Sequence, residues 1–354
     1  MAKEKRIPPK NKNSKVKGHK KTHKARRIFI FIIILALLGL YSVMWVGAFG
    51  NPFKYNSMQS KKAGTENWMS KIEGSKSLSQ INIPGTHDSA TKNISPAWFL
   101  KDQNSSIKTQ LKNGYRYLDI RVKLNKTEDT LLLCHNMGSC RTSIWPWSKK
   151  ITLPQLVADV KEFLLANPEE TVILCIKPEK TSDNERTIVS LIQKLVNEDS
   201  GLWYTKNYIP VLENVRGKIV LARRYNVDSG MALGLNLKWK EQGQLEMVEF
   251  PAEESAINVL QKLQVQDRFK YSVEDKWQAF HDTINEYPSD SSTLVLNFLT
   301  TMEGRMLPHP KKYADQLNKK FLELNSLPPT SGILIFDWAD IELAKKVIDS
   351  NNNK

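Results

Sequence analysis

Two histidines, His87 and His135, stand where they could move protons during a reaction. Each closes a short apolar run of the chain, and a neutral imidazole can take or give a proton near pH 7. Asp88 follows His87 directly, and a carboxylate beside an imidazole can fix its tautomer. A histidine that ends a strand is also a common loop residue, so this segment alone leaves both interpretations open.

A third group that could do chemistry is Arg121, which ends the segment Leu-Asp-Ile-Arg at 118–121. Alternation along a strand places Asp119 and Arg121 on the same face, where they could form a buried structural ion pair. The other interpretation is a guanidinium presented to a phosphate, because its planar fork binds two oxygens. One base, one acid and one cation are together what cleavage of a phosphodiester requires.

These residues belong to a series of short apolar runs that predict strands. Continuous apolar runs are typical of parallel strands that are buried on both faces. Helical patterns separate several of the runs and follow the last one. The predicted strands are 81–87, 115–121, 130–135, 171–177, 217–224, 262–267, 293–298 and 332–337, and the predicted helices are 152–166, 184–197, 272–286, 311–325 and 340–349.

The alternation of strands and helices predicts an α/β fold, and eight strands favour a closed (β/α)8 barrel of the triosephosphate-isomerase (TIM) type. The barrel should be irregular at one connection. Only eight residues separate the strand ending at Arg121 from the strand beginning at Thr130. A helical crossover between parallel strands needs about a dozen residues or more.

Polar residues gather at one end of the predicted strands. In TIM-type barrels the carboxyl ends of the strands build the active site, whereas a purely structural role would scatter ionisable residues over both ends. The residues at or just past these ends are His87, Arg121, His135, Lys177, Arg224, Asp267 and Asp337. Their distribution predicts a catalytic site at this rim.

The net charge of +15 over 354 residues is concentrated at the N-terminus. Residues 1–27 hold twelve Lys and Arg against one acid and thus carry +11. The remaining chain is only mildly basic, which argues against a nucleic-acid-binding domain and indicates no nucleic-acid partner. We expect the 1–27 segment to be a cytoplasmic tail that sets membrane topology, with some affinity for anionic lipid.

Residues 28–50 are uncharged and mostly apolar, and about 20 such residues span a bilayer as a helix. The basic flank predicts a single-pass signal-anchor with the C-terminal domain outside the cell. The run is long for a cleaved signal, whose apolar region has about 7–15 residues, but Ala-Phe-Gly at 48–50 leaves cleavage near Gly50 open. We expect a linker at 51–66 and a catalytic barrel at 67–350.

Three cysteines, Cys134, Cys140 and Cys175, are too few for a disulfide framework. A Cys134–Cys140 bridge could form outside the cell, and the sequence leaves it open. No cysteine or histidine spacing indicates a zinc site. His281 and His309 stand apart from the strand ends, and we assign them no role.

The segments around these residues resemble bacterial phosphatidylinositol-specific phospholipase C. The likeness extends from about residue 68 to about residue 348, and IPGTHDS followed by DIR and a strand-final His is a specific combination. The segments that carry it are IPGTHDSA, GYRYLDIRVKL, TLLLCHN, NPEETVILCIKPE, GKIVLARRY, VQDRFKYS and LIFDW.

The resemblance implies a role for each matching residue. His87 matches the general base that deprotonates the inositol 2-hydroxyl, and His135 matches the general acid that protonates the departing diacylglycerol. Asp337 matches the carboxylate that orients the first histidine, and Asp88 matches the one that couples the acid histidine to Arg121. The implied products are diacylglycerol and inositol 1,2-cyclic phosphate.

Arg121 matches the arginine that bacterial members use where animal relatives bind calcium, so the resemblance implies catalysis without a metal or other cofactor. Two departures concern the headgroup: Asn136 replaces a glycine, and Phe269 replaces a tyrosine on which the inositol ring stacks. The residues that match the inositol pocket are Lys177, Glu179, Arg224, Asp267 and Phe269.

A domain that acts on a bilayer lipid must touch the membrane, and Trp and Phe suit the interface. Trp98 and Phe99 lie where family members carry an aromatic membrane-inserting helix, and Trp145 and Trp147 follow His135 at the same barrel end. Met306-Leu307 follow the seventh strand. These side chains could instead cap the local core.

Two other functions compete with a phospholipase that acts as a monomer on phosphatidylinositol or on a glycosylphosphatidylinositol. The first is a membrane-anchored binder of inositol headgroups, which would not need a paired acid and base. The second is a metal-dependent glycerophosphodiesterase on a similar barrel, which would need Glu and Asp ligands near the first histidine. The strand ends lack Glu in that arrangement.

Overall fold

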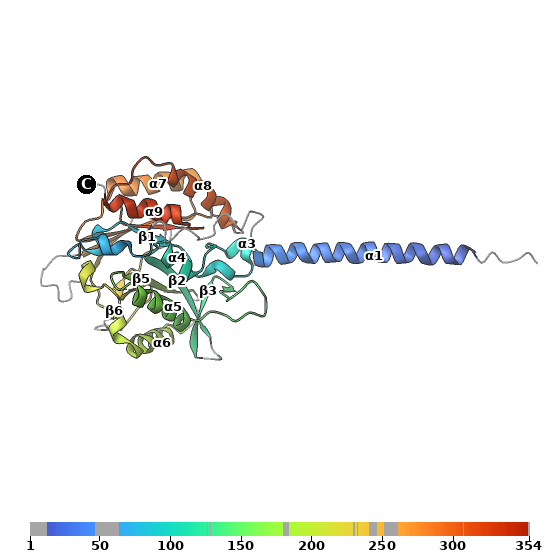
Figure 1. Ribbon diagram of the computed structural model, residues 1–354, viewed down its shortest axis with the longest axis horizontal. Helices are drawn as coiled ribbons and strands as arrows, with labels where there is room; N and C mark the ends of the chain where they lie inside the picture. The colour runs from blue at the N-terminus through green and yellow to red at the C-terminus, as the bar shows by residue number, and fades with distance from the viewer. Residues whose placement is uncertain are drawn as a thin grey trace, which may run out of the picture.

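The computed structural model describes residues 13–46, 64–125, 127, 129–179, 184–228, 231, 233–240, 246–250, 261–306 and 308–352. A folded domain follows one long helix, α1 (Asn13–Tyr41), which projects away from it (Figure 1). A short π-helical turn at Ser42–Val46 continues α1. Residues 1–12 of the predicted tail, 47–50 of the predicted anchor and 51–63 of the predicted linker, and also Leu307, lie outside the described residues.

All eight predicted strands are present, and seven of them form a continuous parallel sheet. Its order is β7-β5-β2-β1-β12-β11-β10, in which every neighbouring pair is parallel. The bounds are β1 (Ile83–Thr86), β2 (Tyr117–Asn125), β5 (Val172–Pro178), β7 (Ile219–Arg223), β10 (Gln261–Gln266), β11 (Thr293–Leu299) and β12 (Ile333–Phe336). The sheet curls into a half-barrel. The predicted α/β fold with an irregular, TIM-like parallel sheet is therefore confirmed.

Full closure of the barrel is not seen among the described residues. The sheet path ends at β6 (Trp203–Tyr204) on one side, where β8 (Leu235–Asn236) also pairs with β7. It ends at β9 (Glu246–Phe250), antiparallel to β10, on the other side. The half-barrel therefore opens between these ends within the described part of the chain.

The predicted irregularity after β2 is a hairpin. Strand β3 (Thr130–His135) runs antiparallel to β2 and carries the short strand β4 (Gly138–Ser139) on its far side. The connection is too short for a crossover, and antiparallel strands need only a turn. We expected His135 to end a parallel strand, and this was wrong: β2 runs past its last pairing with β5, at Val122, and β3 returns to the rim from outside.

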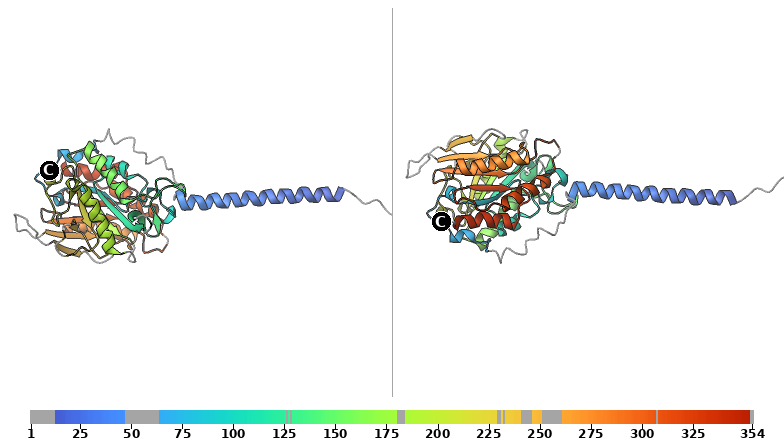
Figure 2. Two further views of the ribbon diagram at one scale, coloured as in Figure 1. Left: turned by 90° about the horizontal axis from the view of Figure 1, so that it is seen from below. Right: turned by 90° about the horizontal axis from the view of Figure 1, so that it is seen from above.

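The five predicted helices are confirmed and cover the outer face of the sheet (Figures 1 and 2). Side-chain caps begin several of them; Thr152, for example, forms a capping box with Gln155 at the start of α5. The bounds are α5 (Leu153–Ala166), α6 (Glu185–Glu198), α7 (Val273–Glu286), α8 (Pro310–Leu322) and α9 (Ile341–Asp349). Two short helices, α3 (Ala97–Leu100) and α4 (Ile107–Lys112), connect β1 to β2.

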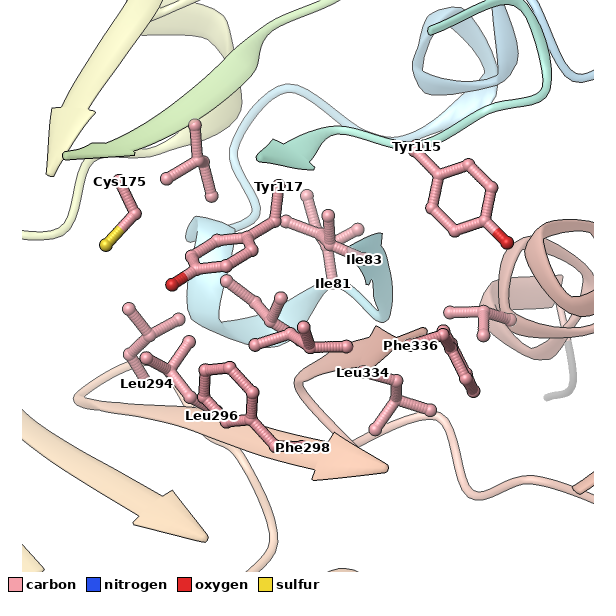
Figure 3. Close-up of a cluster of buried hydrophobic side chains, with 14 of the residues drawn as sticks. Ile81, Ile83, Tyr115, Tyr117, Cys175, Leu294, Leu296, Phe298, Leu334 and Phe336 are labelled. Atoms are coloured by element: carbon pink, nitrogen blue, oxygen red, sulfur yellow. The ribbon is translucent and has the colours of Figure 1, made fainter. Parts of the chain in front are cut away.

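Strand alternation separates the core into an interior and an outer layer, and it aims the polar residues at the rim. Tyr117 on β2 and Cys175 on β5 point into the barrel together with residues of β1 and β11 (Figure 3). Their neighbours Leu118 and Leu174 belong to the outer layer that packs under the helices. Because side chains alternate with period two, Arg121 shares the interior face of Tyr117.

The three cysteines are free and buried, so the Cys134–Cys140 bridge that the sequence left open is not formed. Burial raises the pKa of the Cys134 and Cys175 thiols to about 12. A thiol with such a pKa stays protonated at neutral pH and behaves as a small apolar core residue.

Candidate active site

A cavity of about 470 Å³ opens at the carboxyl ends of the parallel strands. Its floor is charged and its rim is apolar, which suits a ligand with a polar head and apolar chains. The charged lining residues are His87, Asp88, Asp102, Arg121, His135, Lys177, Glu179, Asp267 and Asp337, and the apolar rim includes Phe99, Leu100, Met137, Met302, Met306 and Pro308. The predicted catalytic residues therefore meet in one cavity.

His87 follows β1 and is held between two carboxylates. Its Nδ1 lies 2.9 Å from Oδ1 of Asp337, which follows the neighbouring strand β12. Its Nε2 lies 3.1 Å from Oδ2 of Asp88. Asp88 has a positive φ of 41°, a strained backbone conformation for a residue other than glycine. This turn brings the carboxylate back toward the ring that precedes it.

His135 reaches the same cavity from the hairpin. Its Nε2 lies 3.5 Å from Oδ2 of Asp88, so one carboxylate oxygen lies near the Nε2 atoms of both histidines. Its Nδ1 lies 3.0 Å from the carbonyl oxygen of Leu100 and 2.8 Å from Oδ2 of Asp102. The ring centroids of His87 and His135 are 6.5 Å apart. This spacing leaves room for one phosphorus centre between the two imidazoles.

The guanidinium of Arg121 completes the floor of the cavity. Nε and Nη2 donate to the two carboxylate oxygens of Asp119 at 3.2 and 2.9 Å. Asp88 lies 3.5 Å away and Glu179 lies 3.6 Å away. Asp119 is fully buried, and the two-point contact fixes the guanidinium plane. The remaining Nη1 edge lies toward Glu179, at the end of β5.

The carboxylates change the proton affinity of both histidines. Burial opposes a charged imidazolium, but Asp88 and Asp337 outweigh burial and raise the pKa of His87 well above its ordinary value. In His135 burial is likewise outweighed, by Asp88 and Asp102, and its pKa rises to about 10. His135 is thus held protonated near neutral pH, as a general acid must be.

The carboxyl groups titrate in opposite directions. Burial alone would raise the pKa of Asp88, yet the adjacent His135 and Arg121 hold that pKa well below its ordinary value. Burial raises the pKa of Asp337 to about 7, against the lowering effect of His87. Asp88 therefore remains ionised between the two imidazoles, where it can stabilise positive charge on either ring.

Four of the five residues predicted for the headgroup pocket line the cavity: Lys177, Glu179, Asp267 and Phe269. Arg224 does not line it and instead lies against Trp239, with its guanidinium carbon 3.6 Å from the ring centroid. The indole Nε1 of Trp239 donates to Oδ2 of Asp267 at 3.0 Å. Arg224 is thus placed to support the wall through the tryptophan.

One residue of the site, Asp102, was missed by the sequence analysis. Asp102, in the loop after α3, contacts His135 although it follows no strand, and no local pattern marks it. Asn136, in the place of the family's glycine, keeps a positive φ of 52°, which asparagine tolerates better than most residues. Its backbone N–H donates to Oε1 of Glu179 at 2.8 Å, so the turn after His135 is attached to the pocket wall.

The rim carries the predicted aromatic residues in two groups. Trp145 and Trp147 are exposed and stack on each other with centroids 5.3 Å apart. Phe99 lines the cavity, whereas Trp98 stacks on His309 with centroids 3.9 Å apart. His309, to which we assigned no role, is therefore a half-buried part of this rim, and its Nδ1 lies 2.9 Å from the Trp98 carbonyl oxygen.

Three side chains of the site are close enough together to hold a metal ion, because the ligand atoms of Asp88, Asp102 and His135 lie within 4.8 Å of one another. The guanidinium of Arg121 already lies beside Asp88 and Asp119. A fixed positive charge at that place repels a second cation and neutralises the carboxylates that would bind it. The site is therefore built around an organic cation.

The half-barrel and the side chains at its rim define a class of protein. It is a barrel enzyme with paired imidazoles and a guanidinium at the carboxyl ends of its strands. A sequence model of the family described as phosphatidylinositol-specific phospholipase C, X domain, matches residues 81–225. Over these residues the chain is similar to this family.

Relatives with the name 1-phosphatidylinositol phosphodiesterase match most of the chain. The protein from Staphylococcus aureus is 26% identical over 351 residues, covering 92% of this chain and 98% of its own. The protein from Listeria monocytogenes is 28% identical over 315 residues, covering 84% of this chain and 88% of its own.

Solved structures of phosphatidylinositol-specific phospholipases C share the fold. One from Staphylococcus aureus superposes with a TM-score of 0.66 at 24% identity, covering 82% of this chain and 98% of that one. The Listeria monocytogenes enzyme superposes with a TM-score of 0.62 at 27% identity, covering 82% and 99%.

Proposed function

We propose that this chain is a phospholipase C that cleaves phosphatidylinositol to diacylglycerol and inositol 1,2-cyclic phosphate. The observation that carries the proposal is the placement of two imidazoles, with centroids 6.5 Å apart, on either side of Asp88 and beside the Arg121 guanidinium. A binder of inositol headgroups would not need two proton-transfer groups around one centre. The names of the relatives agree with this reaction.

In the proposed first step the inositol 2-hydroxyl attacks phosphorus. His87 acts in its neutral form, which Asp88 and Asp337 disfavour. It takes the hydroxyl proton while a bond forms between the 2-oxygen and phosphorus and the bond from phosphorus to the glycerol oxygen breaks. His135 gives its proton to that oxygen, and diacylglycerol departs. Arg121 stabilises the charge that develops on the phosphoryl oxygens, and Asp337 holds the His87 ring by its Nδ1.

The pocket walls suit the inositol ring. Lys177, Glu179 and Asp267 offer a donor and two acceptors to ring hydroxyls, and Phe269 offers an aromatic face for stacking. Phe269 lacks the hydroxyl of a tyrosine, so the ring would be held by shape and by the charged residues. The free lipid and a glycosylated form are both candidate substrates, because the cavity opens toward the rim.

A lipid panel tests this function. We expect the purified chain to cleave phosphatidylinositol in vesicles and to leave phosphatidylcholine, phosphatidylethanolamine and phosphatidylglycerol intact, as read by ³¹P NMR of the soluble phosphates. The rate should be unchanged in EDTA and on addition of calcium, because Arg121 supplies the cation. Loss of activity in EDTA would favour a metal-dependent diesterase, and binding without any product would favour the headgroup binder.

We further propose that α1 anchors the chain in a membrane and that the domain works as a monomer outside the cell. The span His23–Met44 has a mean hydropathy of 2.5, and none of its most apolar part is buried in the domain. The turn after α1 lies against α3, and the ring of Tyr41 is 6.0 Å from that of Trp145 (Figures 1 and 2). The helix thus leaves the domain beside the cavity rim, which supports a mouth that faces the membrane.

A test of the anchor compares lipids in two membranes. The full-length chain is reconstituted in vesicles that carry one isotope label on phosphatidylinositol, and these are mixed with protein-free vesicles that carry another. We expect the label of the protein's own vesicles to be consumed first, and the same order when the labels are exchanged. Equal initial rates for both populations would contradict anchoring beside the substrate.

A further inference from the structure

Asp102 is a buried carboxylate on the second ring nitrogen of His135. Its Oδ2 lies 2.8 Å from Nδ1, and the residue is 2% exposed. Two hydrogen bonds of the Asp102 main chain hold the loop without involving the carboxylate. The Asp102 N–H donates to Oγ1 of Thr91 at 3.0 Å, and the Asp102 carbonyl accepts from the N–H of Trp338. The carboxylate can therefore be altered without releasing the loop.

The tautomer of His135 does not depend on Asp102. Nδ1 lies 3.0 Å from the carbonyl oxygen of Leu100, which can only accept a hydrogen bond. Nδ1 must therefore carry a proton whether the ring is neutral or charged, and Nε2 is the atom that exchanges a proton in the cavity. What Asp102 adds is a negative charge at close range.

Several charged groups act on His135 from different elements, and the carboxylates prevail. Asp88 contacts Nε2, Asp102 contacts Nδ1, and both raise the pKa of the ring to about 10 against the effect of burial, with a further contribution from Glu179. The positive groups near these carboxylates are Arg121 and Lys177, and both of them act on Asp88. The full set around the ring is Asp88, His87, Asp102, Arg121, Lys177, Glu179 and Asp337.

We propose that Asp102 is a positioning residue whose charge keeps His135 protonated and thereby shifts the balance between the two steps toward release of the cyclic phosphate. The proposal rests on the proposed phospholipase function. Cleavage of the lipid needs His135 with its proton on Nε2, whereas hydrolysis of the cyclic product needs His135 without it. Asp102 favours the first state of His135 and disfavours the second. It also raises the pKa of His87, but there it contributes less than Asp88 and Asp337, whereas on His135 it follows Asp88 alone.

The proton balance makes the consequence explicit. Hydrolysis forms a bond from water oxygen to phosphorus and breaks the bond from phosphorus to the inositol 2-oxygen. Neutral His135 must take the proton of water, and protonated His87 gives one to the 2-oxygen. Because the carboxylates raise the pKa of His135 to about 10, its neutral form is the minor one at pH 7. Once solvent has reprotonated His135, hydrolysis of the cyclic phosphate can proceed only from the neutral form of His135.

Asp102→Asn tests the proposal, because asparagine keeps the shape and removes the charge. An opposite charge at this distance shifts a pKa by about 1–3 units. We therefore expect the alkaline limit of lipid cleavage to move down by about one pH unit or more. At pH 7 the rate of cyclic phosphate hydrolysis relative to lipid cleavage should rise about tenfold or more, since one unit changes the neutral fraction tenfold. Both steps are followed by ³¹P NMR.

Two further variants separate charge from structure. Asp102→Glu keeps the charge and should retain the alkaline limit and the product ratio of the unaltered chain, even if both rates fall. Asp315→Asn removes an exposed carboxylate on α8 and should change neither quantity. An unchanged limit and ratio in a folded Asp102→Asn, or an equal fall of both steps, would overturn the proposal.

NMR titration of the His135 ring gives a readout that does not depend on activity. We expect its titration to move to lower pH in Asp102→Asn and to stay near its original position in Asp102→Glu. If the unaltered chain cleaves no phosphatidylinositol, the proposed function fails while this titration still decides the effect of Asp102. If Asp102→Asn does not fold, Asp102→Glu must still preserve the titration, and a large downward shift there refutes the proposal.

Discussion

Replacement of His87 or His135 by alanine is expected to lower the release of diacylglycerol from phosphatidylinositol vesicles by about 10²–10⁴-fold, the usual contribution of one general acid or base. Without His87 the attacking hydroxyl loses its proton acceptor, and the neighbouring Asp88 is a poor substitute because it is held ionised with a pKa well below its ordinary value and is a weak base. Without His135 the glycerol oxygen must leave as an alkoxide.

The two variants should differ with a substrate whose leaving group needs no proton. A p-nitrophenyl ester of inositol phosphate should largely restore the His135→Ala rate and should not restore that of His87→Ala, because only the second histidine serves the leaving group. His281→Ala is the matched control, since His281 lies on α7 and packs on Trp277. Near-normal turnover of the lipid by either site variant would refute the mechanism.

Arg121→Lys is expected to lower kcat/KM by about 10²–10³-fold, the scale reported for loss of one preorganised donor to a developing oxyanion. The guanidinium spans both oxygens of Asp119 and still faces Asp88 and Glu179. A lysine ammonium is a point charge on a flexible stem and cannot hold this plane. The loss should fall mainly on kcat, because the charge on the phosphoryl oxygens grows in the transition state.

Steady-state kinetics together with thermal unfolding distinguish this effect from a loss of stability. Arg186→Lys, on the exposed surface of α6, is the matched control and should leave both kcat and Tm unchanged. If Arg121→Lys lowers Tm but retains most activity, Arg121 serves only as the structural partner of Asp119. An unchanged Tm with a large fall in kcat is the expected result.

Much of the site could be predicted because it follows from local rules. The apolar runs marked the seven strands of the continuous parallel sheet but not the two-residue strands β6 and β8 beside β7. Period-two alternation put Asp119 and Arg121 on the interior face of β2. The same alternation places Lys177 at the cavity, because Lys177 lies two residues after Cys175 on β5 and Cys175 points into the barrel. Parallel strands that share a sheet end at one rim, so residues far apart in the chain had to meet there.

The hairpin of β2 and β3 is a feature that local sequence patterns did not predict in full. An eight-residue link excluded a helical crossover, but it did not say that β2 would run beyond Val122 or that His135 would return to the rim. Arg224 followed the same alternation as Lys177, yet Trp239 occupies the space between it and Asp267. The direction of each strand and the packing of large side chains are decided by contacts distant in sequence.

What the sequence by itself determined is the seven strands of the continuous parallel sheet, the face on which each polar side chain lies and the family that the chain resembles. Each of these depends on residues that are adjacent or two apart. Only the tertiary structure decided that Asp102 contacts His135 and that the turn after α1 lies against α3. Those contacts join irregular segments, in which no periodic pattern specifies direction, so their partners are selected only when the whole sheet is folded.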